Sequence, residues 1–172
     1  MSNSTPVPAA ASTFIILDGA LISAPLTAYQ HDDAPWVDSL YRSTRHADAL
    51  EVSPCLIRPS MNTRLWDYLH EWGRYGIGLR STASTEELIS HLRSLISVRL
   101  PSGQLSYCRF YSNKQLQVLL GSFSEQERRD FCGPVLSWFS THPTRPFDDI
   151  QVEGTGLIRT ADEEGWFQVT PE

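Results

Sequence analysis

Short apolar runs alternate with segments of helical periodicity along much of this chain. The runs lie at residues 13–17, 55–58 and 77–80, and each ends at or near a glycine, a proline or a polar residue. Runs of four to eight mainly apolar residues are typical of strands that are buried on both faces of a sheet. Between the second and third runs, four large apolar residues recur at helical spacing: Leu65, Trp66, Leu69 and Trp72. This alternation predicts an α/β fold.

Three further helices are predicted from the residues at which they begin. Ser84, Ser112 and Ser124 each precede a Glu or Gln by three residues, which is the pattern of a capping box. In that motif the serine hydroxyl accepts a hydrogen bond from a backbone N–H of the first turn, and the Glu or Gln side chain bonds back to the serine N–H. We therefore expect all three serines to cap helices.

A β-hairpin is predicted between the first two of these helices. Residues 98–100 and 105–110 flank Pro-Ser-Gly at 101–103, and proline and glycine favour a tight turn. The predicted order is strand, helix, strand, helix, strand, helix, hairpin and two helices. It indicates one α/β domain with a central mixed sheet, flanking helices and a β-hairpin.

The length of 172 residues fits one domain with extensions at both ends. Residues 1–12 are small, polar and proline-bearing, so we expect a flexible leader. The α/β domain is predicted over residues 13–140. Residues 141–172 are interpreted as a linker and an acidic C-terminal tail, with strands expected at 156–160 and 165–170.

The net charge of −6 is unevenly distributed along the chain. Residues 1–41 carry −4, residues 42–147 carry +4 and residues 148–172 carry −6. Nucleic-acid binding usually requires a contiguous, strongly basic face, so we expect no nucleic-acid partner and favour contacts with proteins.

No apolar run is long enough to span a bilayer, and the first basic residue is Arg42, which is too late for a secretory signal. We expect no membrane association and a cytoplasmic location.

The residues suited to catalysis form no recognised motif. The GxSxG, P-loop, GxGxxG and HExxH patterns are all missing, so no enzyme activity, cofactor or metal is expected. The three cysteines form no CxxC pair, and we expect at least two of them to be buried free thiols. Cys132 lies near the end of a predicted helix, where the helix dipole raises a thiol pKa and disfavours a nucleophile. The run His31-Asp32-Asp33 fits a polar loop better than a metal site.

Several short pieces of the sequence occur in a recognisable order. They are residues 17–20, 40–44, 52–56, 72–73, 76–81, 88–93, 98–103, 109–111 and 133–135. Together they resemble the adaptor or effector-chaperone (Tap/TEC) family of bacterial type VI secretion systems, over about residues 13–139. The chain departs from the family in having Ser112-Asn113 where Asp-Pro is usual. It also resembles a shortened form that lacks the helical C-terminal lobe, because only about 33 residues follow Phe139.

The resemblance implies a non-enzymatic protein that binds a secreted effector, stabilises it and helps to load it onto the spike protein VgrG. The residues expected to contact the partner are Arg80, Arg93, Arg99, Arg109 and Tyr111. Arginine can bind carboxylates in a bidentate manner, although these arginines could equally pair with the protein's own Asp and Glu. Two alternatives stay open: an immunity-type protein that neutralises an effector, and a small α/β enzyme that uses Cys132.

Overall fold

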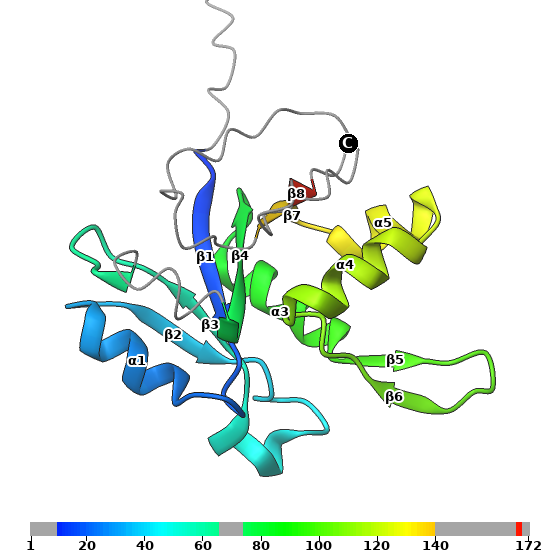
Figure 1. The fold of residues 1–172 in the computed structure, drawn as a ribbon, viewed down its shortest axis with the longest axis horizontal. Helices are drawn as coiled ribbons and strands as arrows, with labels where there is room; N and C mark the ends of the chain where they lie inside the picture. Colours follow the sequence, from blue (N-terminus) through cyan, green and yellow to red (C-terminus); the bar gives the residue numbers. More distant parts are fainter. Residues whose placement is uncertain (1–9, 66–73, 140–167, 170–172) are drawn as a thin grey trace, which may run out of the picture.

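The computed structural model describes residues 10–65, 74–139 and 168–169. Within them, six strands form one sheet with the order β2-β3-β1-β4-β7-β8 (Figure 1). These strands are β1 (Ser12–Leu17), β2 (Trp36–Ser39), β3 (Cys55–Arg58), β4 (Gly76–Ser81), β7 (Val135–Phe139) and β8 (Gln168–Val169). A separate two-stranded sheet is formed by β5 (Ser97–Arg99) and β6 (Leu105–Tyr107). The predicted α/β class, with helices beside a sheet and a hairpin, is confirmed.

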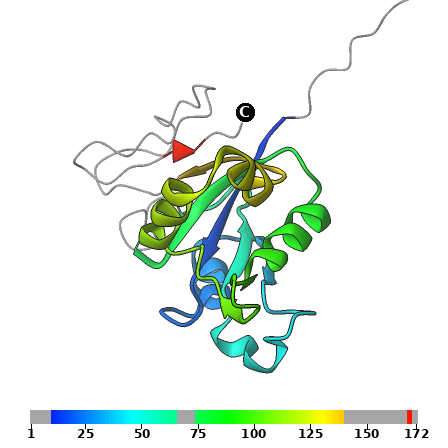
Figure 2. The same cartoon turned by 90° about the vertical axis from the view of Figure 1, so that its right-hand side faces the viewer.

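Helices cover both faces of the main sheet. They are α1 (Ala24–His31), α3 (Thr85–Leu95), α4 (Asn113–Ser122) and α5 (Glu125–Cys132), and a 3-10 helix, η1 (Ala47–Val52), precedes β3. In Figure 2, which looks from the side of the hairpin, α3, α4 and α5 lie in front of the strands, and α1 lies on the other face in Figure 1. The domain therefore has three layers, with the sheet in the middle.

Burial on both faces explains the continuous apolar run of β1. Phe14 and Ile16 belong to the larger core cluster beneath α3, α4 and α5. Ile15 and Leu17 belong to the smaller cluster beneath α1. Because successive strand residues point to opposite faces, a central strand covered on both sides needs apolar residues at every position. The strand predicted at residues 13–17 is confirmed for this reason.

The strand directions correct one part of the prediction. A mixed sheet was expected, but every pairing between described strands of the main sheet is antiparallel. The registers include Ile16↔Leu56 between β1 and β3, and Phe14↔Leu79 between β1 and β4. The connection through α1 joins β1 to β2, which run in the same direction, but β3 lies between them. The α/β class was correct, whereas parallel neighbouring strands did not follow from the predicted alternation of strands and helices.

The three predicted helix caps have different outcomes. The Ser124 hydroxyl and the Glu127 carboxylate form both bonds of a capping box, and the Ser84 hydroxyl accepts a bond from the Glu87 N–H at 3.2 Å. Ser112 occupies the N-cap position of α4, but its side chain makes no capping hydrogen bond. The expectation of a side-chain cap at Ser112 is therefore wrong, and the residue lines a cavity instead.

Gly133 ends α5 in a conformation that favours glycine. Its φ is +50°, and a Cβ atom there would lie 2.4 Å from the Cε1 atom of His91. The His91 ring is held beside it because Nε2 donates to the Phe131 carbonyl at 2.9 Å. Two pieces that carry the family resemblance, those around His91 and Gly133, are thus in direct contact.

Some predicted segments lie outside the described residues. These are most of the leader, the helix expected around Leu65 to Trp72 apart from its first residue, the linker and the strand expected at residues 156–160. The other expected tail strand, 165–170, includes β8, where Val169 pairs with Trp138 of β7.

Candidate partner-binding surface

An ion pair between a buried carboxylate and a partly exposed arginine joins the end of β1 to the loop before α4. The Asp18 carboxylate is only 2% exposed, and its Oδ2 atom accepts hydrogen bonds from Nε of Arg109, at 3.0 Å, and from Nη2. Its Oδ1 atom accepts from the Ala20 N–H at 3.0 Å. The hydrogen bond to Asp18 raises the pKa of Arg109 further. This pair fixes the loop from which α4 begins.

Three tyrosine hydroxyls form a chain beside this loop. The Tyr107 hydroxyl bonds to the Tyr41 hydroxyl and, at 2.5 Å, to the Tyr111 hydroxyl. Burial, reinforced at Tyr107 by these bonds, raises the pKa of both Tyr107 and Tyr111, so the phenols stay protonated. The His46 ring packs edge-on against Tyr107, and its Nε2 lies 3.1 Å from the Ser97 hydroxyl. The base of the β5–β6 hairpin is therefore attached to the domain through side chains.

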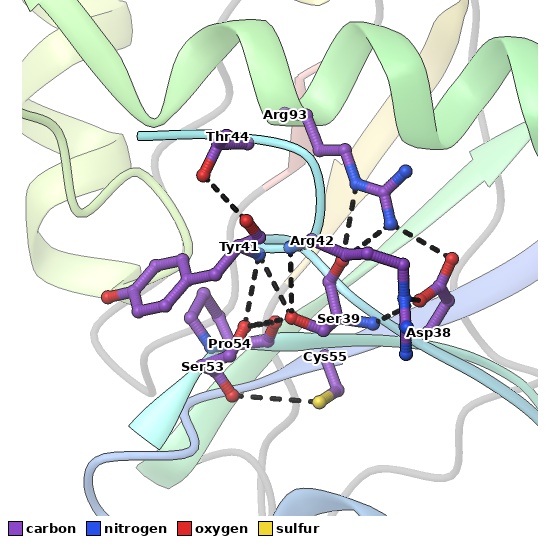
Figure 3. A network of polar contacts seen from close by, with 9 residues as sticks. All are labelled: Asp38, Ser39, Tyr41, Arg42, Thr44, Ser53, Pro54, Cys55 and Arg93. Carbon is purple, nitrogen blue, oxygen red and sulfur yellow. Dashed lines mark hydrogen bonds and ion pairs between the residues drawn. The ribbon is translucent and has the colours of Figure 1, made fainter. Parts of the chain in front are cut away.

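Arg93 of α3 ties that helix to the end of β2 (Figure 3). Its Nη2 atom donates to Asp38 Oδ2 at 2.9 Å and to the Ser39 carbonyl at 2.8 Å. Arg42 donates to the other oxygen of Asp38 at 2.8 Å. Burial alone would raise the pKa of Asp38, but the hydrogen bonds and the two arginine charges outweigh it and hold that pKa below its usual value.

Two buried serines complete this network (Figure 3). The Ser39 and Ser53 hydroxyls lie 2.6 Å apart, and the Tyr41 N–H donates to Ser39 Oγ at 3.0 Å. Ser53 also donates to the Pro54 carbonyl at 2.8 Å. These contacts join residues 40–44 to residues 52–56, two pieces that carry the family resemblance. Such pieces therefore hold the fold together.

The predicted partner-contact residues do not converge on one surface. Arg93 and Arg109 bind Asp38 and Asp18 of the same chain, which is the alternative that the sequence left open. Tyr111 is almost fully buried. A contact of these three residues with a partner stays a prediction.

The remaining two predicted residues are placed differently. Arg80 is partly buried on β4, on the opposite sheet face from Leu79, and its side chain forms no hydrogen bond or ion pair with any described residue. Arg99 lies on the hairpin, where Nη1 donates to the Gly103 carbonyl of the turn at 2.8 Å. Of the five, only Arg99 lies on the hairpin itself.

The β5–β6 hairpin exposes apolar side chains that the sequence did not single out. Val98, Leu100, Leu105 and Tyr107 are between 38% and 42% exposed. In Figure 1 the hairpin extends away from the rest of the domain. The register places Val98 on one face of the ribbon and Leu105 and Tyr107 on the other, so the projecting hairpin offers apolar contact area on both faces. We call these four residues the hairpin surface.

A polar cavity lies close to the base of the hairpin. It has a volume of about 630 Å³ and is formed where the end of β1, the start of β4 and the start of α4 meet. Arg74, Arg109 and Lys114 line it, together with Asp18 and Tyr111. The cavity thus combines three cations with one carboxylate.

The cysteines are buried in a way that disfavours catalysis. All three are free and buried, which confirms the expectation for at least two of them. Burial raises the pKa of Cys55 to about 11 and also raises the pKa of Cys132. At Cys132, burial rather than the helix dipole is the main cause. The Trp138 Nε1–H donates to its sulfur at 3.4 Å, so this thiol is a packed side chain.

The acidic loop after α1 has a structural role. The Asp32 carboxylate accepts hydrogen bonds from the Ala34 N–H at 3.0 Å and the Ser60 N–H at 2.8 Å. Across residues 10–65, 74–139 and 168–169, no group of three or more His, Cys, Asp or Glu is placed to hold a metal ion. Nor does any helix in those ranges have the length and apolarity needed to cross a bilayer.

Comparison with protein families identifies the class to which this domain belongs. Residues 13–130, which are more than half of the chain, match the DUF4123 family, described as a domain of unknown function. The chain belongs to this family. DUF4123 proteins are associated with type VI secretion effector chaperones and are not a known class of enzymes. Neither the curated proteins nor the solved structures include a match to the chain.

Proposed function

We propose that this protein is a non-enzymatic adaptor that binds a type VI secretion effector in the producing cell and stabilises it there. In the same proposal, it helps to mount the effector on the spike protein VgrG. Membership of the DUF4123 family supports this general role. The hairpin surface is the structural observation that carries it, because it offers a partner exposed apolar contacts at a defined place.

The hairpin is suited to this task because its base is held and its tip is exposed. A two-stranded ribbon is only marginally stable alone. Here the Cys108 N–H donates to the Ile96 carbonyl at 2.8 Å, and Tyr107 is bound to Tyr41 and Tyr111. Fixing the contact surface before binding lowers the entropy that a complex loses on formation. We accordingly propose that the effector binds to the hairpin surface.

The division between buried and exposed residues fits an adaptor that serves a particular effector. Asp18, Arg93 and Arg109 are engaged in intramolecular contacts. Val98 and Leu105 are exposed apolar residues that form no such ion pair, so their side chains can be adapted to one partner. In this proposal the pieces that carry the family resemblance maintain the fold, and the exposed hairpin provides specificity for the effector.

Co-expression tests this function directly. We expect the full-length protein to co-purify with the toxic effector encoded by a neighbouring gene, and the soluble yield of that effector to fall severalfold without it. The bound effector should keep its catalytic activity, since an adaptor does not need to block the active site. A complex in which the effector is inactive would contradict the adaptor role and favour the immunity-type alternative. Failure to bind any neighbouring gene product would contradict both.

A further inference from the structure

The cavity beside α4 carries positive charge that the described residues around it do not neutralise. Asp18 is the one carboxylate among the described residues that line it, and Arg109 already binds that carboxylate through Nε and Nη2. Nη1 of Arg109 has no acceptor among the described residues. The Arg74 and Lys114 side chains are exposed and likewise have no hydrogen bond or ion pair within the described part of the chain. Three cations against one carboxylate leave a net charge of +2.

This charge stands out against the rest of the molecule. The whole chain has a net charge of −6, whereas the described residues that line the cavity carry a positive net charge. Its volume of about 630 Å³ lies within the usual range of ligand sites, roughly 300–1,000 Å³. The first turn of α4 contains no acidic residue, and the positive end of that helix adds to the field of the three side chains. These cations therefore favour an anionic ligand.

We propose that this cavity binds the carboxylates of an acidic segment of the partner polypeptide. Guanidinium groups bind carboxylates through paired hydrogen bonds, which Arg74 can supply, and Arg109 can add a bond from its Nη1 atom. The cavity lies next to the base of the hairpin, because Tyr111 in its wall is bonded to Tyr107 of the hairpin. In this proposal a polypeptide that binds the hairpin extends into the neighbouring cavity. The identity of the partner rests on the proposed function, whereas the affinity for carboxylates does not.

The test uses the full-length chain and a fluorescein-labelled peptide of six Glu-Gly repeats, followed by fluorescence anisotropy at low ionic strength. We expect the peptide to bind, with an affinity that falls as salt is added. The double variant Arg74→Ala/Lys114→Ala should weaken binding at least tenfold and keep the thermal unfolding midpoint, because neither side chain has a described partner. The control Arg45→Ala/Arg58→Ala makes the same change of charge at exposed residues outside the cavity. It should stay within about twofold of the unmodified protein.

Four outcomes would overturn the assignment. The first is equal affinity of the cavity variant and the unmodified protein for the peptide. The second is equal binding of a peptide with six Gln-Gly repeats. The third is that inorganic phosphate binds and the glutamate peptide does not, because the site would then take a small anion. The fourth is a tenfold gain in affinity when the seven acids of residues 148–172 are changed to amides, because the chain's own tail would then be the occupant.

The result can be separated from the fate of the proposed function. An effector that co-purifies, combined with unchanged peptide binding by the cavity variant, contradicts the cavity assignment alone. Peptide binding that depends on Arg74 and Lys114, without any effector complex, contradicts the adaptor function alone.

Discussion

Replacing Arg109 with alanine should lower the free energy of unfolding by about 3 kcal/mol, because the substitution leaves the buried Asp18 carboxylate without its counterion. Breaking a buried ion pair costs roughly 3–5 kcal/mol, and the lower end applies here since the Arg109 side chain is 38% exposed. Urea unfolding followed by circular dichroism measures the effect. Adding Asp18→Asn to Arg109→Ala should recover part of the lost free energy of unfolding, because the neutral amide does not need a counterion.

A matched control separates this pair from an ordinary surface pair. Arg129 of α5 pairs with Glu125 one turn earlier, and both side chains are well exposed. Arg129→Ala should therefore cost only about 0.3–0.5 kcal/mol. If Arg109→Ala were as mild as Arg129→Ala, the buried pair would not hold the loop before α4 in place.

Introducing charge on the hairpin should weaken the effector complex strongly without unfolding the protein. We expect Val98→Glu/Leu105→Glu to reduce effector affinity by at least 30-fold, or about 2 kcal/mol, because a carboxylate buried in an apolar contact loses its hydration without gaining a partner. The free protein should keep its stability to within about 0.5 kcal/mol for each change, since both side chains are partly exposed. Titration calorimetry measures the affinity.

The control for this variant is Leu26→Glu on α1. Leu26 is 55% exposed, and α1 covers the opposite face of the sheet from α3, α4 and α5. The change adds the same kind of side chain at a site away from the hairpin, so effector affinity should stay within about twofold. Equal losses in the hairpin variant and in Leu26→Glu would show that added negative charge, and not the hairpin surface, determines binding.

The elements that were predictable from the sequence are those with a strong local signal. The apolar run of β1 and the serine that caps α5 specify their structures through nearby residues alone. β2 (Trp36–Ser39) and β7 (Val135–Phe139) were not predicted. Each is four or five residues long and contains polar residues, and each is defined by its pairing with a strand distant in sequence, β3 for β2 and β4 for β7. Strand direction was likewise set by tertiary pairing.

The candidate surface was less predictable than the fold. Arginine at strand and helix ends fits partner contacts and intramolecular pairs equally well, and only the structure brings Arg109 to Asp18 across 91 residues. The cavity depends on the same long-range assembly, since Arg74 and Lys114 belong to different elements. The exposure of the hairpin's apolar residues could have been predicted from the sequence. Val98, Leu100 and Leu105 flank the predicted turn, and a short two-stranded hairpin cannot bury them.

Hydrogen–deuterium exchange of the full-length protein, with and without the effector encoded beside it, locates the surface to which the partner binds. We expect slower exchange in the complex at residues 97–107 of the hairpin and at residues 109–117 around the cavity, with little change in α1. Protection confined to α1, with unchanged exchange at residues 97–117, would contradict the assignment of the partner to this surface.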